Sequence, residues 1–588
     1  MSTEQPYYNA SSPPVVQGVL VSNNKSNINA NAPTLSPQHI NDHHGVGATE
    51  SASVHHQHVY GSSSETGGHW TKGEHQPRRC NDLWAAILFF AHLATMGFLA
   101  GTYVPRMFRE VAEANDLNGR MLDLEGEFDG AGGLEGNNSW SGRFLSWMIR
   151  GTYRLVMRGG SSPFDSENRG LEDAGGGMED YNNYDVTGTN DFADMVLLLG
   201  ISSLVALVIS TLALGFMIRH AQLLIKFALF FNIGATALFA IGALFLSPFA
   251  AIMGIFLTGL TIYYAYIVWG RIPFAACNLA SATTAVKANL GLAPLAYSSL
   301  IFMFGWSIWW MITFVSTMYI AGNCDGQGNC QNEPSGWLVF PLMLSYHWTF
   351  QVIKNVVHVT VAGTVGTWWF VPTEAASFCS HAVRDSWLRS VTHSFGSICL
   401  GSLLVAIVEA AKNMVRNLRE SDDGGGIFLC IAECLLSLLQ DVLEYFNQWA
   451  FVFVGVYGYP FVQAGKNVME LFKTRGWTTI ITDNLASGVL SMVSAGVGLI
   501  TGLISLAIAH SQGMVFGDEV GASAASFFIG FIIGTVLTST LMTIVSSAVN
   551  TVIVCYAEAP QEFQTNHPKL SEDMRAAWRQ AWPVDFNY

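Results

Sequence analysis

The sequence predicts an all-α, polytopic membrane protein with about ten transmembrane helices and a disordered N-terminal tail. Half of the 588 residues are hydrophobic and only 12% are charged, about half the charged share of a soluble globular protein. Apolar runs of about 20 residues, long enough to cross a hydrocarbon core of roughly 30 Å, recur along the chain. Because residues 1–80 are strongly polar, this apolar content lies downstream of them.

The charge and the motifs argue against several classes of function. The net charge of −15 disfavours nucleic acid as a partner, because its phosphates require clustered Lys and Arg. No HExxH, GxSxG, Walker or paired CxxC pattern occurs, so neither an enzyme nor a bound cofactor is predicted. The opening MSTEQPYYNASSPP does not resemble a signal peptide, and we expect the first span to direct its own insertion.

Residues 1–80 predict a disordered tail, since Ser, Asn, Gln, Pro and His cannot bury enough apolar surface to offset the ordering entropy. The tail holds half of the histidines, in NDHHG and VHHQH among other places. Without Cys or paired carboxylates beside them, a solvated tail is favoured over a metal site. Lys72, Arg78 and Arg79 precede the first span and predict that the tail is cytosolic.

The first span is predicted at 82–104, and the long loop at 105–191 is therefore predicted to be extracellular. This loop is rich in Gly, Asn and acidic residues, and it carries a glycosylation sequon at Asn137. A transmembrane domain is predicted from 195 to 549, followed by a cytosolic tail at 550–588. Its clear spans lie near 195–217, 221–246, 249–270, 294–320, 336–360, 484–509 and 521–549.

A short outer loop, GNCDGQGNC, contains Cys324 and Cys330 on the predicted oxidising side of the membrane. A disulfide between them is favoured over two free thiols. Two weaker apolar segments lie at 392–411 and 449–464, and both must cross if the total is ten. The basic residues after Glu409 would then lie outside, so one segment re-entering or lying in the interface is the alternative.

Small residues at helical spacing predict close helix packing, because backbone approach drives association in lipid. Two such faces lie in the last two spans: Ser487, Ser491, Ser494, Gly498, Gly502 and Ser505; and Ser523, Ser526, Gly530, Gly534 and Thr538. Ionisable residues inside spans or at their ends are costly unless they are paired or hydrated. They are Lys226, Lys354, His358, Glu409 and Asp483, for which snorkelling or structural pairing is the common role.

Five segments resemble the choline transporter-like family, in the branch found in fungi, plants and protists. They are GRIPFAACNLASATTAV (270–286), TFQVIKNVVHVTVAGTVGTWWF (349–370), HSFGSICLGSLLVAIVEAAK (393–412), NQWAFVFVGVYGYPFVQAGKNVMELF (447–472) and VIVCYAEAPQEFQTNHPKLSEDM (552–574). The chain departs from the family pattern at Ala559, where an acidic residue is usual.

The resemblance implies ten spans, a glycosylated first outer loop and a carrier for choline or related organic cations in the lipid bilayer. It places the protein in the plasma membrane, with other endomembranes as the alternative. A non-transporting membrane scaffold of the same family is the competing function. The sequence indicates no oligomeric state.

A choline-like substrate would need aromatic faces and a distant carboxylate, since its trimethylammonium group has no N–H to donate. Trp306, Trp309 and Trp310 share one helical face, and Tyr263 lies on the preceding span. Together with Glu409 as the anionic group, they form the predicted substrate-binding set. The alternatives are interfacial anchoring for the aromatic residues and a local pair with Lys412 for Glu409.

Overall fold

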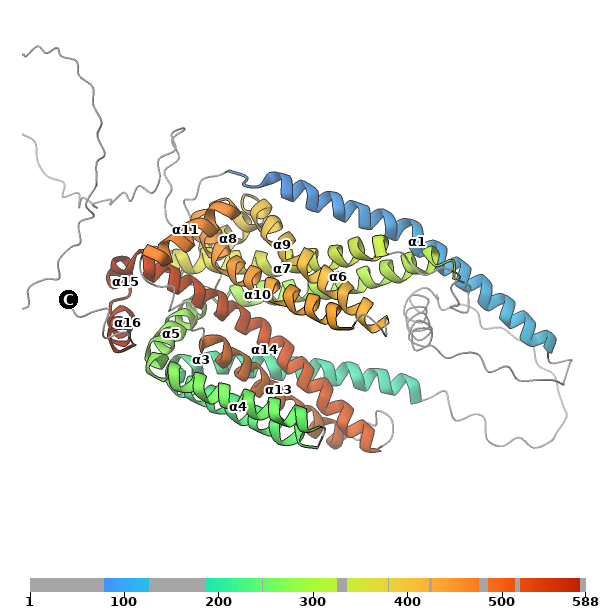
Figure 1. Cartoon of the computed structure of the whole chain (residues 1–588), viewed down its shortest axis with the longest axis horizontal. Helices are drawn as coiled ribbons and strands as arrows, with labels where there is room; N and C mark the ends of the chain where they lie inside the picture. Colours follow the sequence, from blue (N-terminus) through green and yellow to red (C-terminus); the bar gives the residue numbers. More distant parts are fainter. Residues whose placement is uncertain are drawn as a thin grey trace, which may run out of the picture. The chain divides into compact units, whose positions relative to one another are not determined.

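The computed structural model describes residues 79–125, 187–245, 247–324, 331, 336–378, 380–421, 426–474, 485–512 and 519–581. Their regular secondary structure is helical, which confirms the predicted all-α class (Figure 1). The long helices are α1 (Leu83–Glu125), α3 (Thr187–Ala243), α4 (Pro248–Val268), α6 (Leu292–Ala321), α7 (Gly336–Phe370), α9 (Phe395–Ser421), α10 (Gly426–Tyr457), α13 (Leu485–Gln512) and α14 (Glu519–Glu558). Shorter helices are α5 (Ile272–Ala288), α8 (His381–Val391), α11 (Phe461–Thr474), α15 (Pro560–Asn566) and α16 (Pro568–Ala581).

Seven helical segments in the described part of the chain are long and apolar enough to cross a membrane. They include α1, α6, α9, α13 and the apolar part of α14, whereas α4 continues through a short turn into α5 within one segment. Large apolar side chains along α3, α4 and α6 are exposed, as a lipid-facing surface requires. The chain is therefore a multi-pass membrane protein.

Helix α3 contains the two spans predicted at 195–217 and 221–246. A straight helix of its 57 residues would be about 85 Å long, which far exceeds the hydrocarbon core. At His220 the backbone leaves the helical region, with φ −124° and ψ 26°. This kink divides α3 in the gap between the two predicted spans.

The span predicted at 449–464 is wrong in its bounds. Helix α10 begins at Gly426 and includes residues that lie between the two weaker segments predicted at 392–411 and 449–464. It ends at Tyr457, where Gly458 adopts a left-handed φ of 69° and Pro460 interrupts the helical hydrogen bonds. The apolar residues 449–457 thus belong to the end of α10, and residues beyond Pro460 belong to the separate helix α11.

The basic residues that conflicted with the positive-inside count lie within α9. Arg416 and Arg419 contact the Glu433 carboxylate of α10 at 3.0 and 2.7 Å. These cations therefore form ion pairs between two helices instead of lying free in a loop. Helices α9 and α10 pack against each other along this face.

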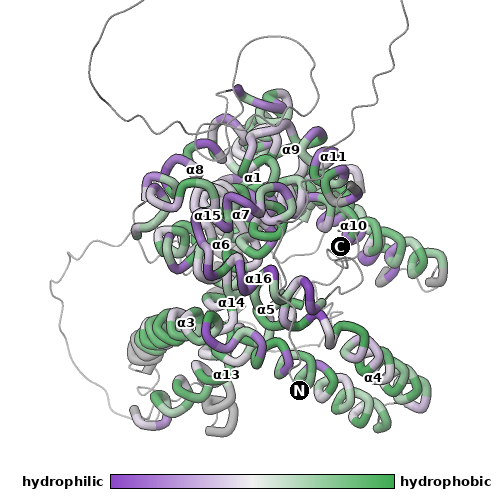
Figure 2. Tube along the Cα trace, turned by 90° about the vertical axis from the view of Figure 1, so that its left-hand side faces the viewer, coloured by the Kyte–Doolittle hydropathy of each residue, from purple (hydrophilic) through white to green (hydrophobic). Residues whose placement is uncertain are grey.

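The helices form two groups. In the α3 group, α3, α4, α5 and α13 pack on one another, while the α7 group contains α1, α6, α7, α8, α9, α10 and α11. Helix α14 packs against α3, α5 and α13 of the first group and against α6, α7 and α10 of the second. Figure 2 shows α14 between α3 and α13 on one side and α7 on the other. The interface between the groups therefore includes α14.

The predicted small-residue faces of α13 and α14 meet, which confirms their packing role. A Cβ atom on Gly498 would lie 2.1 Å from Thr535 Oγ1, and one on Gly530 would lie 2.0 Å from Ser505 Oγ. Ser505 also hydrogen-bonds Ser202 of α3 at 2.7 Å. Small side chains at these positions let three helices approach closely.

Helices α15 and α16 join both groups at one end of the bundle. Helix α15 packs on α7, and α16 packs on α5. The Asn566 side chain donates to the carbonyls of Trp369 and Phe370 at 2.9 and 3.1 Å. Phe563 stacks on Trp369 with ring centroids 4.0 Å apart. The segment after α14 thus forms a hydrogen-bonded cap. Much of α16 is hydrophilic, as its colour in Figure 2 shows.

Candidate functional site

A polar cavity of about 420 Å³ lies between the two helix groups. Five helices contribute residues to its wall. The residues that adjoin them in the sequence are largely apolar. The lining residues are Gln351, Lys354, Asn355 and His358 of α7; Val405 of α9; Glu444, Asn447 and Gln448 of α10; Ser487 of α13; and Thr543, Ser546, Ser547 and Asn550 of α14. Polar groups gathered inside a membrane bundle mark a binding site or a pathway.

The α7 side of the cavity is one helical face. Gln351, Lys354, Asn355 and His358 follow a spacing of three and four residues, which places them above one another. At 1.5 Å per residue, Gln351 lies about 22 Å from the first residue of α7, and His358 lies about 18 Å from the last. The cavity therefore lies near the middle of α7 along its length.

His358 connects three helices beside the cavity. Its Nε2 lies 3.0 Å from the Gln448 carbonyl of α10, and its Nδ1 lies 2.6 Å from Ser547 Oγ of α14. Because a carbonyl only accepts hydrogen bonds, Nε2 donates. Both ring nitrogens are thus engaged by the protein, and His358 joins the α7 group to α14.

Glu444 supplies the carboxylate of the cavity. The Gln440 amide donates to its Oε1 at 2.8 Å. Lys412 of α9 in turn donates to the Gln440 carbonyl oxygen. This chain of contacts holds Glu444 in place, and no described residue forms an ion pair with its carboxylate.

Asn447 extends this side of the cavity and fixes α10 on α9. Its side-chain nitrogen donates to the Gly401 carbonyl at 2.8 Å, whereas its buried Oδ1 has no partner among the described residues. Asn355 donates to Ser402 Oγ at 2.9 Å and joins α7 to the same helix. The wall facing α9 is therefore held by polar contacts.

The predicted residue Glu409 lies behind the cavity wall. His347 Nδ1 is 3.3 Å from its carboxylate, and the lining residue Gln351 donates to the same oxygen at 3.4 Å. Lys412 donates to Gln440 and acts on Glu409 through its charge, without a direct ion pair between them among the described residues. Glu409 therefore orients one wall residue and is not itself among the lining residues.

The predicted aromatic residues lie elsewhere. Trp310 is buried among residues of α1, α6 and α7, and its Nε1 donates to the Leu342 carbonyl at 2.8 Å. Trp306 and Trp309 pack beside it with their ring centroids 5.1 Å apart. Tyr263 is 61% exposed on α4. The structure thus gathers the three tryptophans in one seam, separate from both the cavity wall and Tyr263.

Sequence reasoning missed Glu444, Asn447 and Asn550. A signal exists for α10, because Gln440, Glu444, Asn447 and Gln448 recur at helical spacing within an otherwise apolar stretch. These positions precede the segment predicted at 449–464, so the sequence predicts no span across them. For Asn550 the predicted span ended one residue earlier, whereas α14 continues to Glu558.

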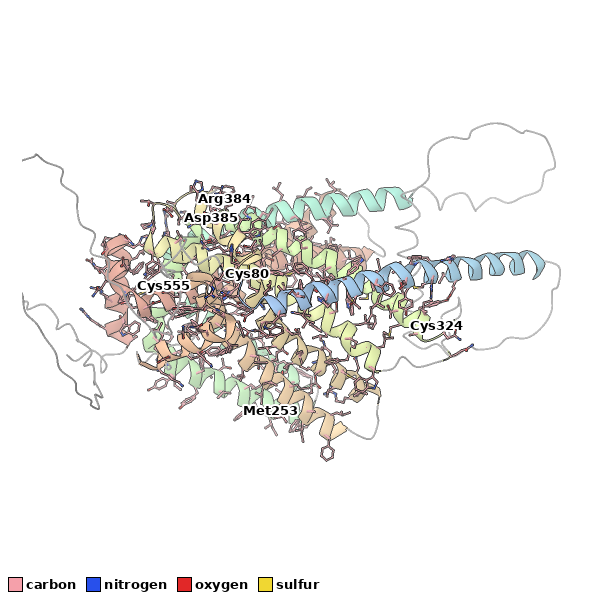
Figure 3. The ribbon with its side chains drawn as sticks, turned by 90° about the horizontal axis from the view of Figure 1, so that it is seen from above. Cys80, Met253, Cys324, Arg384, Asp385 and Cys555 are labelled. Atoms are coloured by element: carbon pink, nitrogen blue, oxygen red, sulfur yellow. The ribbon has the colours of Figure 1, made fainter. Side chains whose placement is uncertain are left out.

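The predicted covalent sites are only partly within the described residues. Cys324 is disulfide-bonded, but Cys330 and Asn137 lie outside the part of the chain that is described. Figure 3 shows Cys324 toward the opposite end of the bundle from Cys555. The pairing of Cys324 with Cys330 and the glycosylation of Asn137 stay predictions. Within the described residues, no group of three or more His, Cys, Asp and Glu side chains could hold a metal ion.

Comparison with known proteins identifies related chains. Residues 252–561 match the family described as plasma-membrane choline transporter. A CTL-like protein of Dictyostelium discoideum is 29% identical over 398 residues, covering 66% of this chain and 68% of the relative. Protein PNS1 of Gibberella zeae is 28% identical over 461 residues, covering 74% and 81% of the two chains. Protein PNS1 of Debaryomyces hansenii is 26% identical over 423 residues, covering 68% and 80%. The matched family region contains every lining residue of the cavity.

Proposed function

The chain belongs to the plasma-membrane choline transporter family, and we propose that it carries choline or a related organic cation across the plasma membrane through the polar cavity. The observation that carries this proposal is the cavity itself. Polar side chains from four helices, α7, α10, α13 and α14, line one space at the interface of two helix groups, inside an otherwise apolar bundle. A carrier needs such a site where relative movement of two groups can change its access.

Glu444 is the proposed partner of the ammonium group. Its carboxylate lines the cavity, and Gln440 contacts only one of its oxygens among the described side chains. A trimethylammonium group offers polarised methyl groups, which contact oxygen atoms through weak C–H···O interactions. The electrostatic attraction to Glu444 supplies the rest of the binding free energy, because the site is partly withdrawn from water.

The position of the cavity supports a transport pathway over a purely structural role. His358, Asn355 and Asn447 join the helices around it, yet the space between these contacts is not filled. A scaffold would gain stability from apolar packing in the same place. The scaffold function predicted as the competing hypothesis would make the cavity irrelevant to activity.

Uptake of labelled choline into proteoliposomes tests the proposal. Wild-type protein should show saturable uptake, and Ser546→Trp should abolish it by filling the cavity from α14. Ser539→Trp is the matched control, since Ser539 lies on an exposed face of the same helix. Absence of saturable uptake under every ion gradient, together with no thermal stabilisation by choline, would favour the scaffold.

A further inference from the structure

A simple cation can pair with only one of the two charged side chains that line the cavity. Lys354 and Glu444 line the same space. Among the described residues, Lys354 takes part in no ion pair, either with Glu444 or with any other carboxylate. A choline molecule would be attracted by Glu444 but repelled by Lys354, since like charges repel.

The uncharged residues of the wall also offer groups that a choline molecule does not use. None of the described lining residues is Phe, Tyr or Trp, so the wall provides no aromatic cage for an ammonium group. The side chains of Gln448 and Asn550 line the cavity, and neither amide nitrogen is used in a hydrogen bond within the described chain. Together with the Lys354 ammonium, they provide several donors. Choline offers only one hydroxyl oxygen to accept from them.

We infer that the cavity binds a zwitterionic amine, which carries a quaternary ammonium at one end and a phosphate or carboxylate at the other. Glu444 faces the ammonium, and Lys354 binds the anionic group with help from Gln448 and Asn550. Such a ligand neutralises both charges of the wall and accepts hydrogen bonds from its free donors. This inference rests on the proposed function, because it names the substrate class of the same cavity.

The size of the cavity is consistent with this class. Its volume of about 420 Å³ equals that of roughly fourteen water molecules at about 30 Å³ each. A choline molecule would leave much of this space to water, whereas an added phosphate extends the ligand toward the second charge. Lys354 is exposed and its side chain is flexible, so it can adjust to anions of different length.

Binding of three probes to the purified full-length protein tests the inference. The probes are choline, glycine betaine and phosphocholine, measured by isothermal titration with wild type, Lys354→Met and Lys354→Arg. Wild type should bind at least one zwitterion about tenfold or more tightly than choline, because a charged hydrogen bond is gained. The two zwitterions distinguish a carboxylate from a phosphate as the anionic group. Lys354→Met should remove the preference, and Lys354→Arg should retain it.

The matched control is Lys226→Met, which removes another lysine from an apolar helix. Lys226 lies on α3 with its ammonium 5.7 Å from the Trp269 ring centroid and does not line the cavity. It should leave the order of the three affinities unchanged. Equal or tighter binding of choline by wild type overturns the inference, as does an equal loss of all three probes in Lys354→Met. Either result is compatible with the proposed function. If folded wild type binds none of the three probes, both the inference and the proposed function are overturned.

Discussion

The imidazole of His358 on α7 lies 2.6 Å from the Ser547 hydroxyl on α14, and this contact joins the α7 group to α14 beside the cavity. Replacement of Ser547 by Ala should lower the free energy of unfolding by about 0.6–1.7 kcal/mol, the range measured for hydrogen bonds between membrane helices. Thermal unfolding in detergent measures the change. Ser539→Ala on the same helix removes an exposed hydroxyl that bonds only to its own backbone, so it should be nearly neutral. Equal effects of the two substitutions would contradict a bridging role.

Gly455 of α10 should not tolerate a side chain. A Cβ atom there would lie 2.7 Å from both the Val359 carbonyl oxygen and the Ala362 Cβ of α7. Gly455→Ala should therefore push the two helices apart and destabilise the protein by about 1–3 kcal/mol. Gly305→Ala on α6 is the control, because nothing lies within 4 Å of its added Cβ. A variant at Gly455 that unfolds with wild-type stability would show that this crossing is loosely packed.

The cap should weaken as the pH falls. Burial against Trp368 lowers the pKa of His567 below its ordinary value of 6.5. The folded protein therefore favours the neutral imidazole, while the unfolded chain takes up the proton more readily. The stabilising contribution is complete above about pH 6.5 and is lost as the pH falls from there through the lowered folded-state pKa. Unfolding temperatures between pH 8 and pH 5 should decline for wild type and decline less for His567→Gln. Identical pH profiles for wild type and His567→Gln would show that His567 does not cause the decline in unfolding temperature.

Glu444→Gln should weaken choline binding without unfolding the protein. The amide retains an oxygen that can accept from Gln440, but the negative charge facing the cavity is lost. We expect the KM for uptake to rise about tenfold, which corresponds to about 1.4 kcal/mol of binding free energy. Glu433→Gln on the same helix should change stability instead, because Glu433 pairs with Arg416 and Arg419 away from the cavity. A reversed pattern would place the cation site near Glu433.

The Trp309→Leu variant tests whether the substrate binds at the aromatic site predicted from the sequence or in the polar cavity. If the tryptophan face holds the ammonium, loss of its π system should weaken binding about two- to thirtyfold. The cavity proposal predicts unchanged choline affinity, because Trp309 packs with Trp306 and Trp310 in the seam of α1, α6 and α7. We expect the second result. If the folded Trp309→Leu variant binds choline less tightly than wild type, the substrate site lies at the tryptophan face.

The sequence alone determined the membrane class, most of the helices and the packing faces of α13 and α14. These features depend on quantities that can be counted along one helix. The length of an apolar run decides whether it can span the bilayer, and small residues at helical spacing decide where backbones can approach. The kink at His220 lies in the gap between the spans predicted at 195–217 and 221–246, although the sequence predicts two separate helices there.

Tertiary structure alone decided which polar faces meet. His358 and Ser547 are 189 residues apart in the chain, and nothing in either local sequence indicates that they are partners. The polar face of α10 has the spacing of an amphipathic connection, and only its packing on α7, α9 and α14 shows that it lines a cavity. The tryptophans of α6 share a face whose purpose, packing or binding, depends on what lies opposite them. The physical reason is that helical spacing defines a face, whereas long-range packing determines whether lipid, protein or an enclosed space lies against it.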